Sequence, residues 1–213
     1  PLRLVGSEMC IRDRSYIELL KNIMHLDNWG LKAKKLGYRS RAVFKLEEII
    51  EKTKALKGCK NVLDIGAAPG GWSQFIKHKI KEANVHAIDI LDIDPIEGVN
   101  FHKIRVEDID NAEEIFKLKG SFHLVISDLA PNLTGISVID ESNIYELNDI
   151  TLDVAVEYLD KSKGVFIIKT FQNNMLKKLR TKMKGLFDDV QTFKPAASKK
   201  QSAEIYLYGA FKE

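Results

Sequence analysis

Cysteine is scarce in this 213-residue chain, and Cys10 and Cys59 lie far apart with no Cys-x-x-Cys spacing. The sequence therefore disfavours a disulfide-stapled scaffold and a thiolate metal site. The five histidines show no His-Glu-x-x-His or similar spacing, so we expect surface or core residues and predict no metal site. This pattern fits a reducing, cytoplasmic setting.

Long apolar runs are also missing, because no stretch approaches the roughly 18 apolar residues that a membrane-spanning helix requires. We therefore expect no membrane partner. The net charge of +3 says little about other partners, and we find no internal repeat or low-complexity tract. The length and the 45% hydrophobic share predict one globular domain with a substantial core, most simply a monomer.

The first fifteen residues do not join the pattern that follows them. Their apolar run is too short for a signal peptide and has no clear cleavage site. We expect residues 1–15 to be a leader outside the fold and residues 16–213 to form the single domain. Tyr16 to Leu26 is expected to form a short helix.

The stretch that organises the chain is residues 61–72, which read N-V-L-D-I-G-A-A-P-G-G-W. An apolar run that ends in small residues and enters an amphipathic segment predicts a strand, a tight loop and a helix. The dinucleotide fingerprint requires a glycine where Ala68 stands, which argues against a bound pyrophosphate. Asp89 ends the next apolar run, where a ribose-binding carboxylate is expected. A ribose without a pyrophosphate indicates S-adenosylmethionine (SAM); the plainer alternative is a structural glycine turn.

Apolar runs continue to alternate with helical patterns, which predicts a mostly parallel α/β sheet with right-handed crossovers and helices on both faces. Further strands are expected at 85–90, 101–106, 122–127, 164–168, 190–193 and 204–211, with helical stretches at 152–159 and 175–186. Residues 133–145 show no clear periodicity, so we expect a mobile substrate loop there.

Charged residues gather where the predicted strands end, and ligands of open α/β sheets bind at that edge. Asp89 can accept hydrogen bonds from ribose hydroxyls, and Asp108 is placed to accept one from an adenine amino group. Asp128 and Lys169 follow neighbouring strands and could meet. A lysine acting as a base at neutral pH needs its pKa lowered by roughly three units, and a second cation such as Lys45 would help.

A cationic segment precedes the glycine loop, with six lysines and arginines in residues 32–45 and Trp29 and Tyr38 nearby. One interpretation is a solvated charged face. The other is a surface that contacts nucleic-acid phosphates, with aromatic rings that stack on unpaired bases. A second basic stretch spans Lys177 to Lys184.

Six stretches in order resemble the FtsJ/RlmE-type ribosomal RNA 2′-O-ribose methyltransferase family. They are R-S-R-A-V-F-K-L (39–46), D-I-G-A-A-P-G-G-W-S-Q (64–74), D-P-I-E-G-V-N-F (94–101), S-D-L-A-P-N (127–132), F-I-I-K-T-F (166–171) and S-A-E-I-Y-L (202–207). The resemblance runs from about Gly37 to the C-terminus. It implies the Rossmann-like SAM-dependent methyltransferase fold, in which residues 204–211 form an antiparallel strand.

The resemblance also implies roles for individual residues. The family's K-D-K-E catalytic tetrad falls on Lys45, Asp128, Lys169 and Glu204, with Lys169 as the base for a ribose 2′-hydroxyl. Cofactor contacts fall on Gly70, Trp72, Asp89, Asp108 and Asp128. The implied reaction is in-line methyl transfer from SAM to a uridine-type ribose of ribosomal RNA or the large ribosomal subunit.

Three other functions were weighed, besides methylation of the transfer RNA anticodon loop. A base N-methyltransferase would favour an N/D-P-P-Y/F-type motif where this chain has D-L-A-P-N. A NAD-dependent dehydrogenase is disfavoured by the missing glycine and by the absence of a catalytic Tyr-x-x-x-Lys. A non-catalytic RNA-binding module of the same fold is disfavoured by the complete tetrad.

Overall fold

The computed structural model describes residues 28–132, 134–198 and 201–212 of the chain. The expected leader (1–15) and the expected helix (16–26) lie outside these ranges. Among the described residues, no helix combines the length and apolar character needed to cross a membrane.

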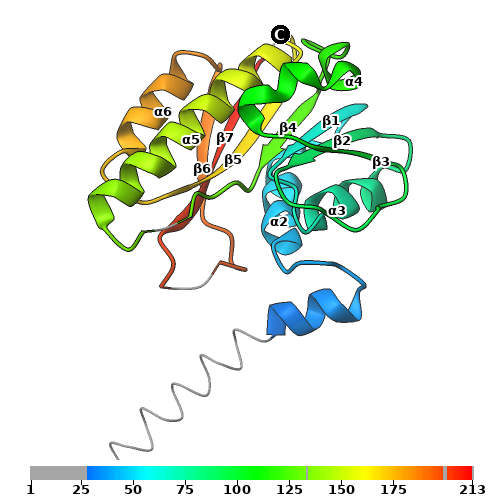
Figure 1. The fold of residues 1–213 in the computed structure, drawn as a ribbon, viewed down its shortest axis with the longest axis horizontal. Coiled ribbons are helices and arrows are strands. Elements are labelled where there is room, and N and C mark those ends of the chain that lie inside the picture. Colours follow the sequence, from blue (N-terminus) through cyan, green and yellow to red (C-terminus); the bar gives the residue numbers. More distant parts are fainter. Residues whose placement is uncertain (1–27, 133, 199–200, 213) are drawn as a thin grey trace, which may run out of the picture.

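A seven-stranded sheet in the order β3-β2-β1-β4-β5-β7-β6 forms the centre of the protein (Figure 1). β1 to β5 pair in parallel, whereas β7 runs antiparallel to both β5 and β6, which confirms the predicted sheet and its one reversed strand. The strands are β1 (Asn61–Ile65), β2 (Asn84–Asp89), β3 (Val99–Lys103), β4 (Leu124–Ser127), β5 (Val165–Phe171), β6 (Asp189–Phe193) and β7 (Glu204–Ala210).

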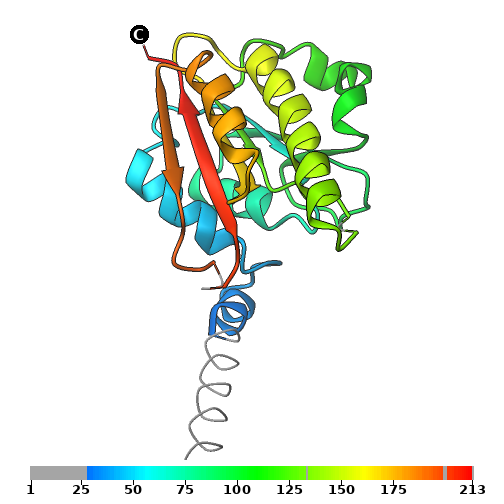
Figure 2. The same cartoon turned by 90° about the vertical axis from the view of Figure 1, so that its left-hand side faces the viewer.

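Helices cover both faces of the sheet, as Figures 1 and 2 show. They are α2 (Val43–Thr53), α3 (Gly71–Lys79), the short 3₁₀ helix η1 (Val106–Asn111), α4 (Glu113–Phe116), α5 (Ser137–Tyr158) and α6 (Leu176–Lys184). α2 and α3 pack on one face, and α5 and α6 pack on the other. A helical segment at residues 28–35 projects beyond the edge at which the parallel strands end (Figure 1).

The central strands are mostly apolar because both of their faces are buried. In β1, Val62 points into the cluster under α2 and α3, and Leu63 and Ile65 point into the cluster under α5 and α6. Successive side chains of a strand point to opposite faces, so one short run supplies both cores. This packing fixes where the strands end and therefore where the functional edge lies.

Three expectations about element boundaries were wrong. The stretch expected to be a loop at 133–145 is helical from Ser137, because the first turns of α5 carry exposed apolar side chains that give no amphipathic pattern. β3 ends at Lys103, and η1 follows it. β5 continues to Phe171, since its last residues pair with β7, so Lys169 lies inside the strand.

Candidate active site

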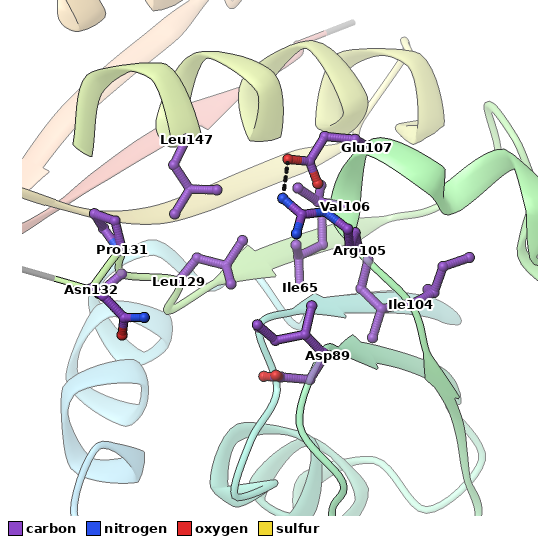
Figure 3. Close-up of a pocket in the computed structure, with 14 residues that line it drawn as sticks. Ile65, Asp89, Ile104, Arg105, Val106, Glu107, Leu129, Pro131, Asn132 and Leu147 are labelled. Carbon is purple, nitrogen blue, oxygen red and sulfur yellow. Dashed lines mark hydrogen bonds and ion pairs between the residues drawn. The ribbon is translucent and has the colours of Figure 1, made fainter. Parts of the chain in front are cut away.

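The strand order reverses direction between β1 and β4, and a concave site lies beyond the carboxyl ends of these strands. This larger pocket has a volume of about 260 Å³, slightly below the roughly 300–1,000 Å³ of common small-molecule sites. Figure 3 shows Asp89, Leu129, Pro131 and Leu147 around it. A smaller pocket shares Gly66 with it and extends toward Trp72 and Asp128. Together they form one elongated site.

Two glycines of the glycine loop adopt a conformation that other residues rarely take, and one of them, Gly66, lines both pockets. Gly66 has φ +78°, and a Cβ there would lie 2.5 Å from the Leu129 side chain. Gly70 has φ +99°, and a Cβ there would lie 2.6 Å from Ile96. Larger residues at either position would strain the backbone and displace a neighbour.

Asp89 holds the shape of this loop from the end of β2. One of its carboxylate oxygens accepts a 2.9 Å hydrogen bond from the Ala68 amide, and the other accepts a 2.8 Å bond from the Leu91 amide. The side chain lines the larger pocket, although the residue is only 8% exposed. Each carboxylate oxygen can accept a further hydrogen bond, so Asp89 is able to bind a ligand hydroxyl as well.

Arg39 binds the other side of the glycine loop. A phosphate-contacting face was one of the two interpretations of the segment that contains it. Its guanidinium donates to the carbonyls of Pro69 (3.2 Å), Asp94 (2.6 Å) and Pro95 (2.7 Å). Its backbone amide donates to Gln74 at the start of α3. Arg39 therefore ties the glycine loop to the segment after β2.

Asp64 is an unusual carboxylate at the base of the smaller pocket. It is 1% exposed, and Ser73 Oγ donates to its Oδ2 at 2.6 Å. Its Oδ1 has no hydrogen-bond partner among the described residues. Burial raises the pKa of Asp64 to about 7, with Asp128 and Asp89 contributing to the rise. The site thus contains a buried acceptor able to receive a positively charged or hydrogen-bonding ligand group.

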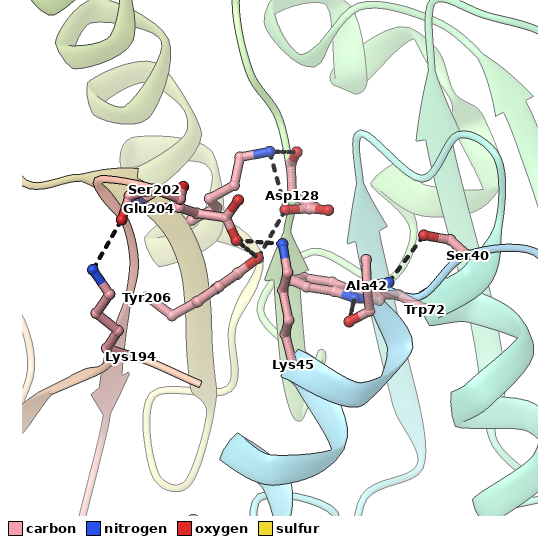
Figure 4. A network of polar contacts seen from close by, with 10 residues as sticks. Ser40, Ala42, Lys45, Trp72, Asp128, Lys194, Ser202, Glu204 and Tyr206 are labelled. Carbon is pink, nitrogen blue, oxygen red and sulfur yellow. Dashed lines mark hydrogen bonds and ion pairs between the residues drawn. The ribbon is translucent and has the colours of Figure 1, made fainter. Parts of the chain in front are cut away.

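Two lysine–carboxylate pairs lie beside the smaller pocket (Figure 4). Lys45, on α2, pairs with Glu204 at the start of β7. Lys169, on β5, lies 3.0 Å from Asp128 Oδ1 and also donates to the Asp128 backbone carbonyl. Both lysines are only 9% exposed, so each ammonium group lies in a largely enclosed site with its own carboxylate.

Tyr206 connects the two lysine–carboxylate pairs, and no sequence pattern had indicated a role for it. Its hydroxyl lies 2.8 Å from Glu204 Oε1 and 3.2 Å from Asp128 Oδ1. It pairs with Lys169 across β5 and β7, and its ring lies 5.9 Å from that of Trp72. The sequence could have identified Tyr206, because side chains two positions apart on a strand, such as those of Glu204 and Tyr206, lie on the same face.

The charges around Glu204 favour its ionised form. Burial alone would raise the pKa of Glu204, but the hydrogen bond and charge of Lys45 and the hydroxyl of Tyr206 hold it below its usual value. Burial, with the charges of Asp128 and Glu204, raises the pKa of Tyr206, so its hydroxyl stays protonated. That hydroxyl is therefore a donor to one carboxylate at a time.

The structure brings most of the predicted site residues together. Trp72 and Asp128 line the smaller pocket, with the Trp72 indole donating to the Ala42 carbonyl at 2.9 Å. Gly70 shapes the loop but is absent from the lining of both pockets. Asp108 is exposed on η1, and its neighbour Glu107 lines the larger pocket instead.

The cationic segments are only partly available to a ligand. Lys34 and Lys35 are exposed on the helical segment at 28–35, whereas Lys32 lies over the Trp29 ring, 5.1 Å from its centroid. On α6, Lys182 pairs with carboxylates of α5, while Lys177 and Lys184 are exposed.

Comparisons with known proteins agree with this geometry. The model of the FtsJ-like methyltransferase family matches residues 38–212. A protein named ribosomal RNA large subunit methyltransferase E from Ehrlichia chaffeensis is 41% identical, over 83% of this chain and 84% of its own length. One of the same name from Stenotrophomonas maltophilia is 38% identical, over 94% and 96%.

A solved structure supports the same assignment. The crystal structure described as a ribosomal RNA methyltransferase from Plasmodium falciparum superposes with a TM-score of 0.72 at 30% identity, covering 82% of this chain and 98% of that one. The match of the family model over most of the chain, with relatives near 40% identity, is decisive. The chain belongs to the FtsJ-like methyltransferase family and is a methyltransferase.

Proposed function

We propose that this protein transfers a methyl group from SAM to a ribose 2′-hydroxyl of large-subunit ribosomal RNA. The observation that carries the proposal is the pair of enclosed lysines, Lys45 and Lys169, beside the pocket that the glycine loop shapes. A hydroxyl is a weak nucleophile, and an amine held at the reacting position can remove its proton. The names of the similar proteins support ribosomal RNA as the substrate.

The residues of the elongated site fit SAM. The larger pocket suits a nucleoside, with Asp89 at the ribose hydroxyls and apolar side chains such as Ile90 and Leu129 around the base. The smaller pocket suits the methionine end, because Asp64 and Asp128 offer acceptors to its cationic groups. When bound there, SAM supplies an electrophilic methyl group on a sulfonium.

The roles of the four charged residues follow from their contacts. Lys169 accepts the proton of the 2′-hydroxyl, and Asp128 holds its amine in place through the side-chain oxygen and the backbone carbonyl. Lys45, held in place by its ion pair with Glu204, stabilises negative charge that develops on the ribose oxygen. Orientation of the reactants contributes several kcal/mol, and proton removal contributes about 10²–10⁴-fold in rate.

Exposed cations near the same edge would hold the RNA backbone. Lys34 and Lys35 are exposed on the helical segment that projects from the edge at which the parallel strands end (Figure 1). Phosphate contacts of this kind position a strand without reading its sequence. The target ribose must be unpaired or made accessible to reach the enclosed lysines.

The test is transfer of radiolabelled methyl from SAM to three acceptors: large ribosomal subunits from a methylation-deficient strain, naked ribosomal RNA, and bulk transfer RNA. Alkali-resistant dinucleotides report 2′-O-methylation. We expect label in large-subunit RNA that the Lys169→Ala substitution abolishes. SAM binding without any alkali-resistant product would contradict ribose chemistry, and label confined to transfer RNA would overturn the substrate while keeping the reaction.

A further inference from the structure

A cluster of three metal-ligating side chains lies away from the active site. His86 is on β2, His102 on the edge strand β3, and Glu114 on the short helix α4. His86 Nδ1 is 3.3 Å from His102 Nε2, and His102 Nε2 is 3.7 Å from Glu114 Oε2. All three ligand atoms lie within 4.8 Å of one another. We propose that His86, His102 and Glu114 form a binding site for a divalent transition metal, with zinc as the best-fitting ion.

The spacing of the two nitrogens matches tetrahedral zinc. Zn–N bonds of about 2.0–2.1 Å at the tetrahedral angle put neighbouring ligand atoms about 3.3–3.4 Å apart. The His86–His102 separation of 3.3 Å has this value without any movement. Glu114 Oε2 is 3.7 Å from His102 Nε2 and within 4.8 Å of His86 Nδ1, so it must move toward both nitrogens, and its side chain is 68% exposed and has room to do so.

A simple hydrogen bond between the rings is the competing explanation, and three features favour the metal. A hydrogen bond between two neutral rings uses one N–H group and one nitrogen lone pair, whereas a metal ion binds the lone pairs of both nitrogens at once. His86 is 3% exposed, so water has little access to its ring and cannot easily serve as its partner. Glu114 then adds the negative charge that a cation requires.

The donor set narrows the identity of the ion. Two imidazole nitrogens and one carboxylate oxygen suit zinc, cobalt, nickel or copper rather than magnesium or calcium, which prefer oxygen ligands. A tetrahedral ion would take a water as its fourth ligand, and the exposed Glu114 side of the cluster is open to solvent.

The site would stabilise one end of the sheet rather than take part in methyl transfer. It links the edge strand β3 to β2 and to α4, and its residues are not among those that line the larger pocket. Ile104 and Arg105, which do line that pocket, follow His102 closely in the chain. A metal that binds only the folded protein raises its unfolding temperature by mass action.

Untagged full-length protein is freed of metal with EDTA, and zinc binding is followed by calorimetry and thermal unfolding. Cobalt is the spectroscopic probe, because tetrahedral cobalt absorbs strongly in the visible range. His102→Gln and Glu114→Gln remove single ligands. His78→Gln is the matched control, since His78 is exposed and lies outside the cluster.

We expect one zinc per chain and a rise in unfolding temperature of about 5 to 10 °C when free zinc is about 100 times Kd. His102→Gln should weaken zinc binding at least about tenfold, Glu114→Gln by less, and His78→Gln not at all. Equal zinc binding by His102→Gln and His78→Gln, or no saturable binding by the parent chain, would overturn the proposal. A lower unfolding temperature of metal-free His102→Gln, together with no zinc response of the parent chain, would show a hydrogen bond only.

Discussion

The two halves of the functional edge use their carboxylates in different ways. On the β2 side, Asp89 accepts hydrogen bonds from backbone amides, so its charge sets the shape of the glycine loop. On the β4–β5–β7 side, Asp128 and Glu204 each pair with a lysine side chain. Carboxylates thus shape the glycine loop in one half and hold lysine side chains in the other.

This difference predicts that substitutions in the two halves change different quantities, cofactor affinity in one and reaction rate in the other. Interactions that are equal in the ground state and the transition state change KM, whereas those made only in the transition state change kcat. Substitutions on the β2 side should therefore weaken cofactor binding, and substitutions on the lysine side should slow the reaction. Substitutions of Lys169, Asp89, Asp64 and Tyr206 test this division.

The largest effect is expected for Lys169→Met, which keeps the length of the side chain and removes the amine. We expect kcat for RNA methylation to fall by about 10²–10⁴-fold, because the proton acceptor is lost. SAM affinity, measured by calorimetry, should stay unchanged. Lys194→Met is the control, since Lys194 is an exposed lysine bonded to the Ser202 carbonyl. Equal losses of rate and cofactor affinity would contradict the division.

Asp89→Asn tests the opposite half. It keeps a side-chain oxygen for one amide but replaces the other acceptor with a donor that faces an N–H group. A hydrogen bond to a charged group is worth about 1.5–3 kcal/mol, so SAM affinity should fall about 10- to 100-fold with a smaller change in kcat. Asp92→Asn is the control, because Asp92 is exposed and pairs only with Lys103 among the described residues. An unchanged Kd would show that Asp89 does not contribute to cofactor binding.

Asp64 lies between the two halves, and its pKa predicts a pH dependence. Its folded pKa of about 7 lies above an unfolded value of about 3.9. The folded state therefore binds more protons between these values, and the contribution of Asp64 to stability is fully present below about pH 4 and lost as the pH rises through 7. Above pH 7 Asp64 is ionised in both states, so the amount by which its burial lowers the free energy of unfolding no longer changes with pH.

Asp64→Asn removes this charge and can keep the contact with Ser73. The free energy of unfolding of the variant should rise relative to that of the parent chain by about 2.6 kcal/mol when the pH is raised from 5 to 8. Urea unfolding at both pH values measures the difference, and Asp92→Asn should show none of it. A constant difference between the two pH values would mean that Asp64 is already ionised at pH 5 in the folded protein.

Much of the fold was predictable because it depends on local patterns. Alternating apolar runs and small-residue loops predicted the succession of strands along the chain, and the resemblance predicted that β7 is antiparallel. The start of α5 was missed because Ile136, Val138 and Ile139 are exposed there and interrupt the amphipathic pattern. Periodicity reports burial, so a helix that projects past its sheet loses the signal.

The site was less predictable where long-range partners decide a role. Arg39 belongs to a cationic segment by composition, but its guanidinium bonds to carbonyls that lie 30 or more positions away. His86 and His102 show no metal-ligand spacing in the sequence because adjacent strands bring them together. Side-chain type and spacing identify candidates, while only the packed structure shows which partner each has.

The smallest effect is expected for Tyr206→Phe, on the residue that joins the two lysine pairs. The substitution removes only a hydroxyl that lies close to both Glu204 and Asp128. One net hydrogen bond of about 1 kcal/mol predicts a roughly fivefold lower kcat, with SAM affinity unchanged. The pH profile of kcat should also shift, because the hydroxyl of Tyr206 helps to lower the pKa of Glu204 and a purely structural role would leave that ionisation unaltered. Tyr208→Phe, on the same strand, is the control, since none of its described contacts is a hydroxyl hydrogen bond. If Tyr206→Phe weakens SAM binding instead of slowing methyl transfer, then the lysine half also shapes the cofactor site, and the division between affinity and rate fails at this residue.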